Sequence, residues 1–250
     1  MQYVVMHKAD AAHEAGTKPP TEVIENMGRL IGETIHNGQL LLGAGLHASS
    51  RRLRVVARGG RCEVQAGPYP GRNELPAAIV AIRVGDRDEA IEWAKRYANA
   101  LGGDAEVELG PQVEPWDLGK MKRPEGKVPA RFLIVQKADA ATESGKVPPA
   151  VRKALAALLA AMAEQGVLEF AETLAPSSQS KRLLYRDHRR TVVDGPFAES
   201  KELIGGFCKL QMRSLDEVVE WTDRYARILG GNVEVDLRPV GEPIAAANAR

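Results

Sequence analysis

The sequence predicts an α+β fold that occurs twice in one chain. Three observations support this prediction. The 250 residues are enough for two units of roughly 100 residues, each with its own core. Two long stretches match each other along their length, with a shift of a single residue. Each stretch also alternates between strand-like and helix-like hydrophobic patterns.

The duplication rests on two pairs of matching segments. YVVMHKADAAHEAGTKPP (3–20) corresponds to FLIVQKADAATESGKVPP (132–149), and after a one-residue deletion residues 37–111 correspond without a gap to residues 165–239. Between the copies, QVEPWDLGKMKRPEGKVPA is interrupted by proline and glycine, which is typical of a linker. We therefore divide the chain into repeat 1 (1–111), a linker (112–130), repeat 2 (131–242) and a frayed tail (243–250).

The first half of each repeat predicts one helix among several strands. A short apolar strand covers residues 2–8, and Pro19 and Pro20 then open a helix with an apolar stripe at helical spacing that ends before Gly38. Strands are expected to follow at residues 40–46, 52–57, 62–66 and 79–84.

The second helix has the clearest start signal. Asp86 with Glu89 in repeat 1, and Ser214 with Glu217 in repeat 2, are spaced as capping boxes. A Gly-Gly pair closes this helix before a last strand.

The order β-α-β-β-α-β is that of a ferredoxin-like fold, an antiparallel sheet with two helices on one face. Residues 3–6 and 132–135 are apolar on both alternating faces, although two helices cover only one face of a sheet. We therefore expect two ferredoxin-like repeats packed sheet to sheet, as an intramolecular dimeric α+β barrel. Cavities are expected between the sheets, or where loops of one half cover the other.

The composition argues against several classes of partner. A formal net charge of +1 leaves no overall positive field for a phosphate backbone, so we expect no nucleic acid. The longest apolar run, ALAALLAAMA, is shorter than the ~20 residues of a membrane span, and the N-terminus turns polar too early for a signal peptide. We expect a cytoplasmic protein without a membrane partner, as a pseudo-two-fold symmetric monomer or a homodimer.

The sequence contains none of the common cofactor or metal motifs. It has no HExxH or CxxC spacing, no Walker A loop, no GxGxxG between a strand and a helix, and no GxSxG elbow. Cys62 and Cys208 occupy unequal repeat positions, and we interpret them as small apolar strand residues. We expect no metal and no cofactor.

Residues 193–207, VDGPFAESKELIGGF, resemble the signature of the DGPF-domain group within the YCII-related family. The resemblance extends over both copies through an early lysine, a Glu-Ala-Gly or Glu-Ser-Gly segment, and a Glu-Trp helix. It implies a fold like that of dimeric α+β barrel proteins. It also implies enzymes with a His and Asp pair, and for some relatives a link to sigma factors.

The two repeats keep different residues of the family motifs. His47 matches the family histidine where repeat 2 has Ala175, and Asp194 matches the DGPF aspartate where repeat 1 has Ala66. Glu172 keeps a motif acid that repeat 1 lacks. A carboxylate beside an imidazole raises its basicity near pH 7, so His47, Asp194 and Glu172 are the candidate catalytic residues.

Two arrangements of these residues are open. His47 and Asp194 form one composite site across the two halves, or only one of two former sites still works. The structural alternatives are that Asp194 only accepts backbone N–H groups in its turn, and that His47 is an ordinary loop histidine.

The candidate ligand-binding residues are His7, Lys8, Lys137 and Phe197. His7 alternates onto a sheet face, where we expect a polar position between the sheets, and Gln136 replaces it in repeat 2. Lys8 and Lys137 occupy equivalent positions, so both halves have this lysine. The alternative role for each lysine is an ion pair with the aspartate two residues further on.

Two functions are compatible with these residues. The first is a cofactor-independent acid–base enzyme that acts on a small molecule in a cavity between the repeats. The second is a non-catalytic small-molecule-binding or regulatory module, linked to sigma-factor signalling as in some relatives.

Overall fold

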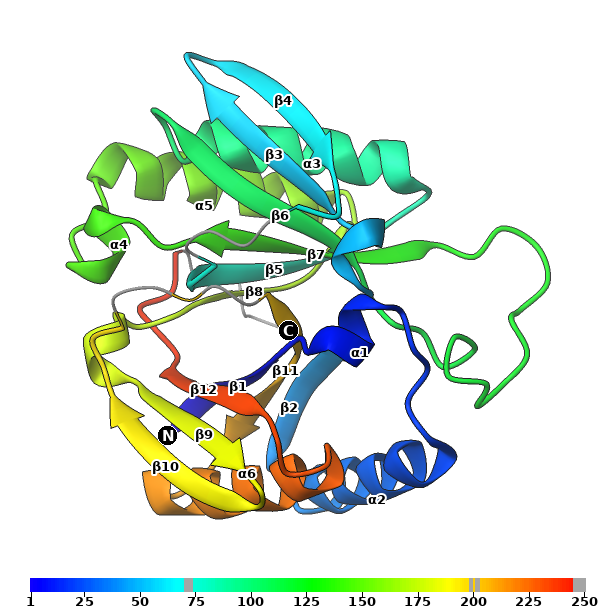
Figure 1. Cartoon of the computed structure of the whole chain (residues 1–250). Helices are drawn as coiled ribbons and strands as arrows, with labels where there is room; N and C mark the ends of the chain where they lie inside the picture. Colours follow the sequence, from blue (N-terminus) through cyan, green and yellow to red (C-terminus); the bar gives the residue numbers. More distant parts are fainter. Residues whose placement is uncertain (70–73, 198–199, 201–202, 245–250) are drawn as a thin grey trace.

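A computed structural model describes residues 1–69, 74–197, 200 and 203–244 of the chain. Its elements form four layers, in the order helices, sheet, sheet, helices (Figure 1). α3 (Arg87–Ala100) and α5 (Pro149–Glu164) cover one outer side, and α2 (Thr21–His36) and α6 (Leu215–Ile228) cover the other. The fold is therefore α+β with two sheets packed against each other, as the sequence predicts.

Both layers of strands are six-stranded and antiparallel. Sheet I has the order β10 (Arg189–Asp194), β9 (Lys181–Arg186), β12 (Glu234–Pro239), β1 (Gln2–Lys8), β11 (Ile204–Gln211), β2 (Leu40–Gly45). Sheet II has the order β4 (Arg61–Ala66), β3 (Leu53–Arg58), β6 (Ala105–Pro111), β7 (Ala130–Lys137), β5 (Pro76–Val84), β8 (Leu168–Thr173). The remaining elements are short: α1 (Ala11–Glu14), α4 (Ala140–Glu143), and the 3-10 turns η1 (Ser49–Arg51) and η2 (Ser177–Gln179).

Each sheet contains strands of both repeats. In sheet I, β1 of repeat 1 lies between β12 and β11 of repeat 2, and β2 pairs with β11. In sheet II, β7 of repeat 2 lies between β6 and β5 of repeat 1, and β8 pairs with β5. The ferredoxin-like units are therefore exchanged, because the first two strands of each unit come from one repeat and the last two from the other.

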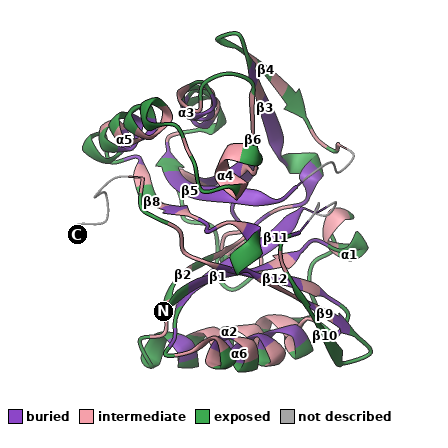
Figure 2. Cartoon of the chain, turned by 90° about the vertical axis from the view of Figure 1, so that its left-hand side faces the viewer, coloured by how far each residue is buried: buried purple, intermediate pink, exposed green. Residues whose placement is uncertain are grey.

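The core between the sheets explains why the first strands are apolar on both faces. On β1, Val4 and Met6 belong to the core between the sheets, whereas Tyr3 and Val5 pack toward α2 and α6. On β7, Leu133 and Val135 belong to the same inter-sheet core. The strands between the layers are largely buried, whereas the outer faces of the helices are exposed (Figure 2).

The structure adds two short helices that the sequence analysis did not predict. α1 and α4 follow the first strand of each repeat, and the side chains of Asp10 and Asp139 accept the N–H groups of His13 and Thr142 at their starts. These aspartates act as helix N-caps.

The predicted capping residues do begin α3 and α6. The side chains of Asp86 and Ser214 accept the N–H groups of Glu89 and Glu217. The side chains of these two glutamates do not return to the backbone N–H of the cap residue, so the reciprocal capping box is not completed. The Glu89 carboxylate accepts the N–H of Gly85, and the Glu217 carboxylate accepts the N–H of Arg213.

The chain after β12 is described as far as Ile244. Ile244 packs against the core between sheet II and its helices, although the sequence predicts a frayed tail from residue 243. Residues 245–250 of that predicted tail lie outside the described residues. Among the helices of the described chain, none is both long and apolar enough to cross a membrane.

Candidate functional site

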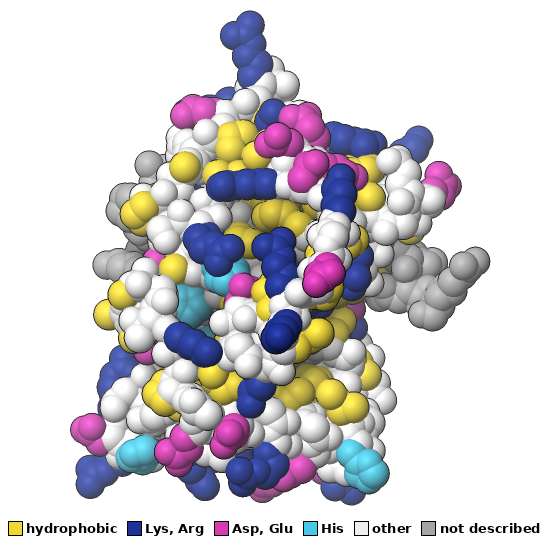
Figure 3. Space-filling view, turned by 90° about the vertical axis from the view of Figure 1, so that its right-hand side faces the viewer, with side chains coloured by type: hydrophobic (Ala, Val, Ile, Leu, Met, Phe, Trp, Pro, Cys, Tyr) yellow, Lys and Arg dark blue, Asp and Glu magenta, His cyan; other side chains and the backbone are white. Residues whose placement is uncertain are grey.

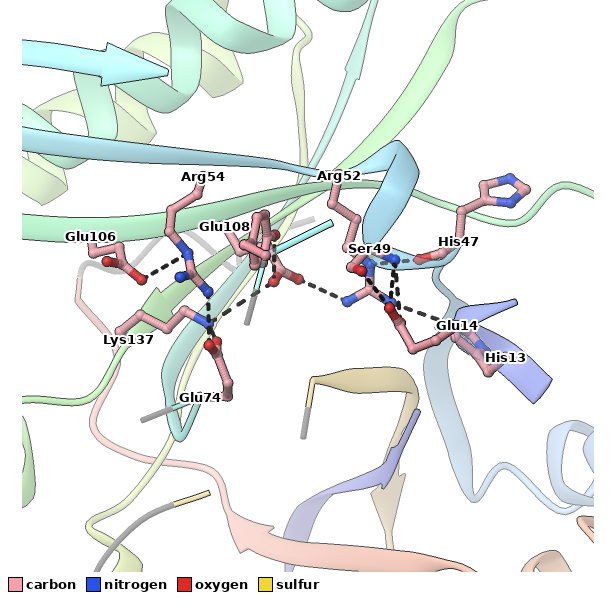
Figure 4. Close-up of polar contacts among 11 residues, drawn as sticks. His13, Glu14, His47, Ser49, Arg52, Arg54, Glu74, Glu106, Glu108 and Lys137 are labelled. Carbon is pink, nitrogen blue, oxygen red and sulfur yellow. Dashed lines mark hydrogen bonds and ion pairs between the residues drawn. The ribbon is translucent and has the colours of Figure 1, made fainter. Parts of the chain in front are cut away.

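Charged residues form one network in each half, around Lys137 in one and around Lys8 in the other. In the first network, Lys137 pairs with Glu74 and lies 4.0 Å from Glu108. Arg54 donates to Glu74 at 2.7 Å and pairs with Glu106 at 2.9 Å. Figure 4 shows these side chains meeting between strands of sheet II.

The second network repeats this arrangement around Lys8. Its ammonium lies 3.0 Å from Asp236 and donates to Ser200 at 2.8 Å. Arg182 pairs with Asp236 at 2.7 Å and with Glu234 at 3.0 Å. Each lysine therefore comes from one repeat and its acid from the other.

The networks correct one interpretation of the two lysines. Lys8 and Lys137 pair with acids of the opposite repeat rather than with Asp10 and Asp139, because those aspartates turn back to cap α1 and α4. Burial and the nearby arginines lower the pKa of Lys137 well below its usual value. Because both halves keep the network, we interpret it first as a structural link between the repeats.

Phe197 lies beside the second network. Its backbone N–H donates to the hydroxyl of Ser177 at 3.1 Å, and the guanidinium of Arg182 lies 4.4 Å from the centre of its ring. Tyr69 is its counterpart in repeat 1, with Arg54 over the ring at 3.9 Å, and its hydroxyl donates to Glu108 at 2.9 Å.

The sequence predicts that His7 lies between the sheets, but the structure places it elsewhere. Its side chain points to the helix side of sheet I, where Nδ1 and the hydroxyl of Tyr225 are 2.7 Å apart. The expectation was wrong because odd positions of β1 face the helices and even positions face the other sheet. Burial is the main cause that lowers the pKa of His7 from 6.5 to about 3.

His47 contacts a residue that the sequence analysis missed. Its Nε2 lies 3.2 Å from Oδ2 of Asp117 in the linker, and Nη1 of Arg51 lies 2.9 Å from its Nδ1. Burial and Arg51 lower the pKa of His47, against the opposing effect of Asp117. The ring points away from the charged network (Figure 4). On the face that carries α1 and the linker, histidines lie among lysine and arginine side chains (Figure 3).

Asp194 lies at the end of the edge strand β10. Its exposed carboxylate pairs with Lys181 on the neighbouring strand. The turn after it is hydrogen-bonded to the η2 region, because the N–H of Gly195 donates to the carbonyl of Ser180 at 3.0 Å. Asp194 therefore lies at the repeat 2 end of the molecule.

The described contacts do not join the three predicted catalytic residues to one another. The N–H of His47 donates to the carbonyl of Pro111, and that of Ala175 donates in the same way to Pro239. His47 and Ala175 therefore occupy matching places at opposite ends. Asp194 lies at the same end of the molecule as Ala175, and therefore at the end opposite to His47.

Glu172 forms a buried ion pair that bridges the two sheets. It extends from β8 of sheet II and pairs with Lys209 of β11 in sheet I. The side chains of Lys209 and Glu172 are only 8% and 6% exposed. Lys209 was missed by the sequence analysis, although a lone charge in the apolar strand IGGFCKLQ is a usable signal.

The equivalent positions in the other half carry no charge. Ala44 corresponds to Glu172 and Ala81 to Lys209. Ala81 is buried in the inter-sheet apolar core, and Ala44 packs against it. Both members of the ion pair are thus replaced together.

Two cavities adjoin the chain segment after β12. The small cavity has a volume of about 280 Å³, and its lining includes Gln2, Leu159, Glu172, Lys209 and Pro243. The large cavity has a volume of about 540 Å³, and its lining includes Gln136, Thr142, Leu155, Ala175 and Gln179. They share the wall residues Thr173, Val240, Gly241, Pro243 and Ile244.

No metal centre is formed in the part of the chain that the structure describes. No group of three or more His, Cys, Asp or Glu side chains there is arranged to hold an ion.

The fold defines the class of protein: two exchanged ferredoxin-like units made by a tandem repeat, with the sheets facing each other. The family profile described as YCII-related domain matches the chain twice, over residues 1–111 and 130–239. The chain therefore belongs to the YCII-related family. A comparison with curated proteins found no match.

Proposed function

We propose that the chain is a cofactor-independent enzyme that transfers protons on a small carbonyl compound bound in the small cavity. The carrying observation is the Glu172–Lys209 pair, which is buried, opens to that cavity and exists in one half only. A buried ion pair is often no better for stability than well-packed apolar residues. The alanines of the other half support this view, because the same fold does without the pair there.

The chemistry follows from the two groups. Glu172 acts as general base and takes a proton from the carbon next to the carbonyl. The electrons of the broken C–H bond form a C=C bond, and the carbonyl electrons move to oxygen as an enolate. The ammonium of Lys209 donates a hydrogen bond to that oxygen. Delivery of a solvent-derived deuteron to the same carbon gives exchange. In a β,γ-unsaturated substrate the intermediate is a dienolate, and delivery of the proton to its γ-carbon moves the double bond and gives isomerisation.

A second acid–base candidate is supported by the contact between His47 and Asp117. In this arrangement Nε2–H donates to Asp117, while Nδ1 accepts from Arg51. Arg51 is exposed, so an anionic substrate that draws it away would free Nδ1 to act as a base. A catalytic role for Asp194 and ligand binding by Lys8, Lys137, His7 and Phe197 stay predictions, as do the DGPF group and a cytoplasmic location.

The binding alternative uses the same cavity without chemistry. A ligand with both a carboxylate and an amine would replace the internal pair by binding Lys209 and Glu172 separately. This version makes the protein a small-molecule sensor, which is the regulatory function considered above.

Deuterium exchange tests the enzyme proposal. The α-protons of cyclopentanone and 2-oxobutyrate are followed by NMR in D₂O, with wild type, Glu172→Gln and the double variant Glu172→Ala/Lys209→Ala. We expect wild type to accelerate exchange of at least one probe, and both variants to lose about 100- to 10,000-fold of that rate. The double variant reproduces the alanines of the other half, and we expect its free energy of unfolding to lie within about 1 kcal/mol of wild type.

The single variants supply the matched control for folding. Glu172→Ala and Lys209→Ala each leave one buried charge unpaired, and we expect each to cost about 3–5 kcal/mol. Exchange that persists in the folded double variant but is lost in His47→Ala would move the reaction to His47 and Asp117. No acceleration by wild type with either probe, together with tight binding of an amino acid, would favour the sensor.

A further inference from the structure

The large cavity occupies the place where the other half of the molecule carries histidines. Gln136, Thr142 and Ala175 line it, and their counterparts in repeat 1 are His7, His13 and His47. Three imidazoles are thus replaced by an amide, a hydroxyl and a methyl group. The titratable side chains in the lining are Arg152 and Glu242, which pair with each other at 3.0 Å. The lining therefore has no net charge.

One polar group in this cavity is held in a fixed orientation. The hydroxyl of Tyr97, which is completely buried, donates to Oε1 of Gln136 at 3.0 Å. Burial raises the pKa of Tyr97, so the phenol stays protonated and continues to donate. The Oε1 atom is therefore used by the protein itself.

The other end of the same amide is directed to the cavity. Gln136 as a whole is only 8% exposed. In the described chain, its Nε2 atom is nevertheless not one of the fully buried side-chain nitrogen and oxygen atoms that lack a hydrogen-bond partner. Within the described chain Nε2 makes no hydrogen bond, the one side-chain hydrogen bond of Gln136 being that of Oε1, and Gln136 lines the cavity. The two N–H groups of Nε2 are thus presented to whatever occupies that space.

We propose that the large cavity is a second binding site, for a neutral small molecule whose carbonyl or amide oxygen accepts a hydrogen bond from Nε2 of Gln136. Leu155, Ala77 and Ala78 supply apolar wall for the rest of the molecule. Arg152 and Glu242 are paired with each other at the exposed part of the lining. A carboxylate or an amine placed beside Gln136 would therefore be desolvated without a counter-charge, which favours a neutral ligand. This site is separate from Glu172 and Lys209, and its ligand is not required to react.

The probes are butyramide, butyrate and butylammonium, which have the same chain and differ in the head group. Each is titrated into ¹⁵N-labelled protein, and the side-chain amide signal of Gln136 is identified by its loss in Gln136→Leu. We expect butyramide to shift that signal and to bind more tightly than either ion. Gln136→Leu should weaken butyramide binding by about three- to tenfold, the effect of one hydrogen bond.

Three further variants make the test independent of folding defects and of the proposed enzyme. Tyr97→Phe frees the amide to rotate, so butyramide should bind about two- to threefold more weakly. His7→Gln changes the matching position of the other half and should leave binding unchanged, as should Glu172→Ala/Lys209→Ala. Equal affinity for all three probes, or unchanged butyramide binding in Gln136→Leu and Tyr97→Phe, would overturn the proposal.

Discussion

At the scale of single residues, the two repeats serve as an internal comparison. Tyr97 and Tyr225 are equivalent, and both direct a buried hydroxyl at the residue that follows the apolar part of the first strand. In repeat 2 that residue is Gln136, and in repeat 1 it is His7. The same tyrosine position thus orients an amide in one half and an imidazole in the other, which changes how the halves respond to pH.

This difference predicts a pH dependence of stability. His7 has a pKa of about 3 in the folded chain against 6.5 ordinarily, so between these values the unfolded chain binds the proton and the folded chain does not. Its contribution is therefore present above pH 6.5 and is lost as pH falls toward 3. The loss is at most about 1.4 kcal/mol per pH unit. His7→Gln removes it.

The measurement is urea unfolding of wild type and His7→Gln at pH 7, 5.5 and 4. We expect the variant to gain stability relative to wild type as the pH falls. His13 and His47 also have lowered pKa values, and both proteins contain them. Because the charge of His13 helps to lower the pKa of His7, the difference between the proteins measures His7 together with this coupling. A difference that does not change with pH would contradict the lowered pKa, because it would show that His7 takes up its proton equally readily in the folded and unfolded chains.

At the scale of strands, the two halves place an equivalent buried guanidinium group, but they supply it from different strands. Arg52, just before β3, donates to the carbonyl of His47 at 2.5 Å and to Glu108 at 2.8 Å. In repeat 2 the same place is filled from β12, where Arg238 donates to the carbonyl of Ala175 at 2.5 Å. Gly110 corresponds to Arg238, and a Cβ there would lie 3.4 Å from the side chain of Arg52. A side chain at position 110 would therefore occupy the same space as the side chain of Arg52.

This exchange predicts a rescue. Arg52→Ser introduces the residue of repeat 2 and removes the main partner of the buried Glu108, at a cost of about 3 kcal/mol. Adding Gly110→Arg supplies a guanidinium from the neighbouring strand β6, and we expect at least half of the loss to be recovered. Urea unfolding of both single variants and the double variant measures the coupling.

The single variants decide whether the rescue is specific. Gly110→Arg alone places two guanidinium groups in one space and should destabilise the chain. Purely additive effects of Arg52→Ser and Gly110→Arg would contradict the shared position.

At the scale of the whole molecule, the exchange of strands makes each repeat incomplete. β7 separates β6 from β5 in sheet II, and β1 separates β12 from β11 in sheet I. A repeat without its partner therefore has no central strand to connect its last two strands. The linker joins two halves that are already bound to each other along both sheets.

A cleavable linker tests this arrangement. A specific protease site is inserted after Glu125, and the cut chain is analysed by gel filtration and circular dichroism. We expect the pieces 1–125 and 126–250 to remain together at the size of the intact chain, because strand pairing holds them. The piece 1–125 expressed alone should be unfolded or should pair with itself. A stable folded monomer of that piece would contradict the exchanged topology.

Much of the fold could be predicted because the sequence features that indicate it involve neighbouring residues or the similarity of the two repeats. The duplication, the apolar faces of β1 and β7, and the caps at Asp86 and Ser214 all depend on neighbouring residues or on comparison of the copies. The same comparison, together with the family motif, identified Glu172 as an acid that one half has kept and the other has lost. It could not supply a partner for Glu172, because pairing across two sheets has no signature in the sequence.

The sequence by itself determined that two ferredoxin-like repeats face each other and that the halves have diverged at His47, Glu172 and Asp194. The tertiary structure alone decided which charges meet: Glu172 with Lys209, His47 with Asp117, and Lys137 with Glu74. The physical reason is the difference between local and distant interactions. Periodicity and capping act within a few residues, whereas ion pairs in this fold join strands of different repeats that only folding brings together.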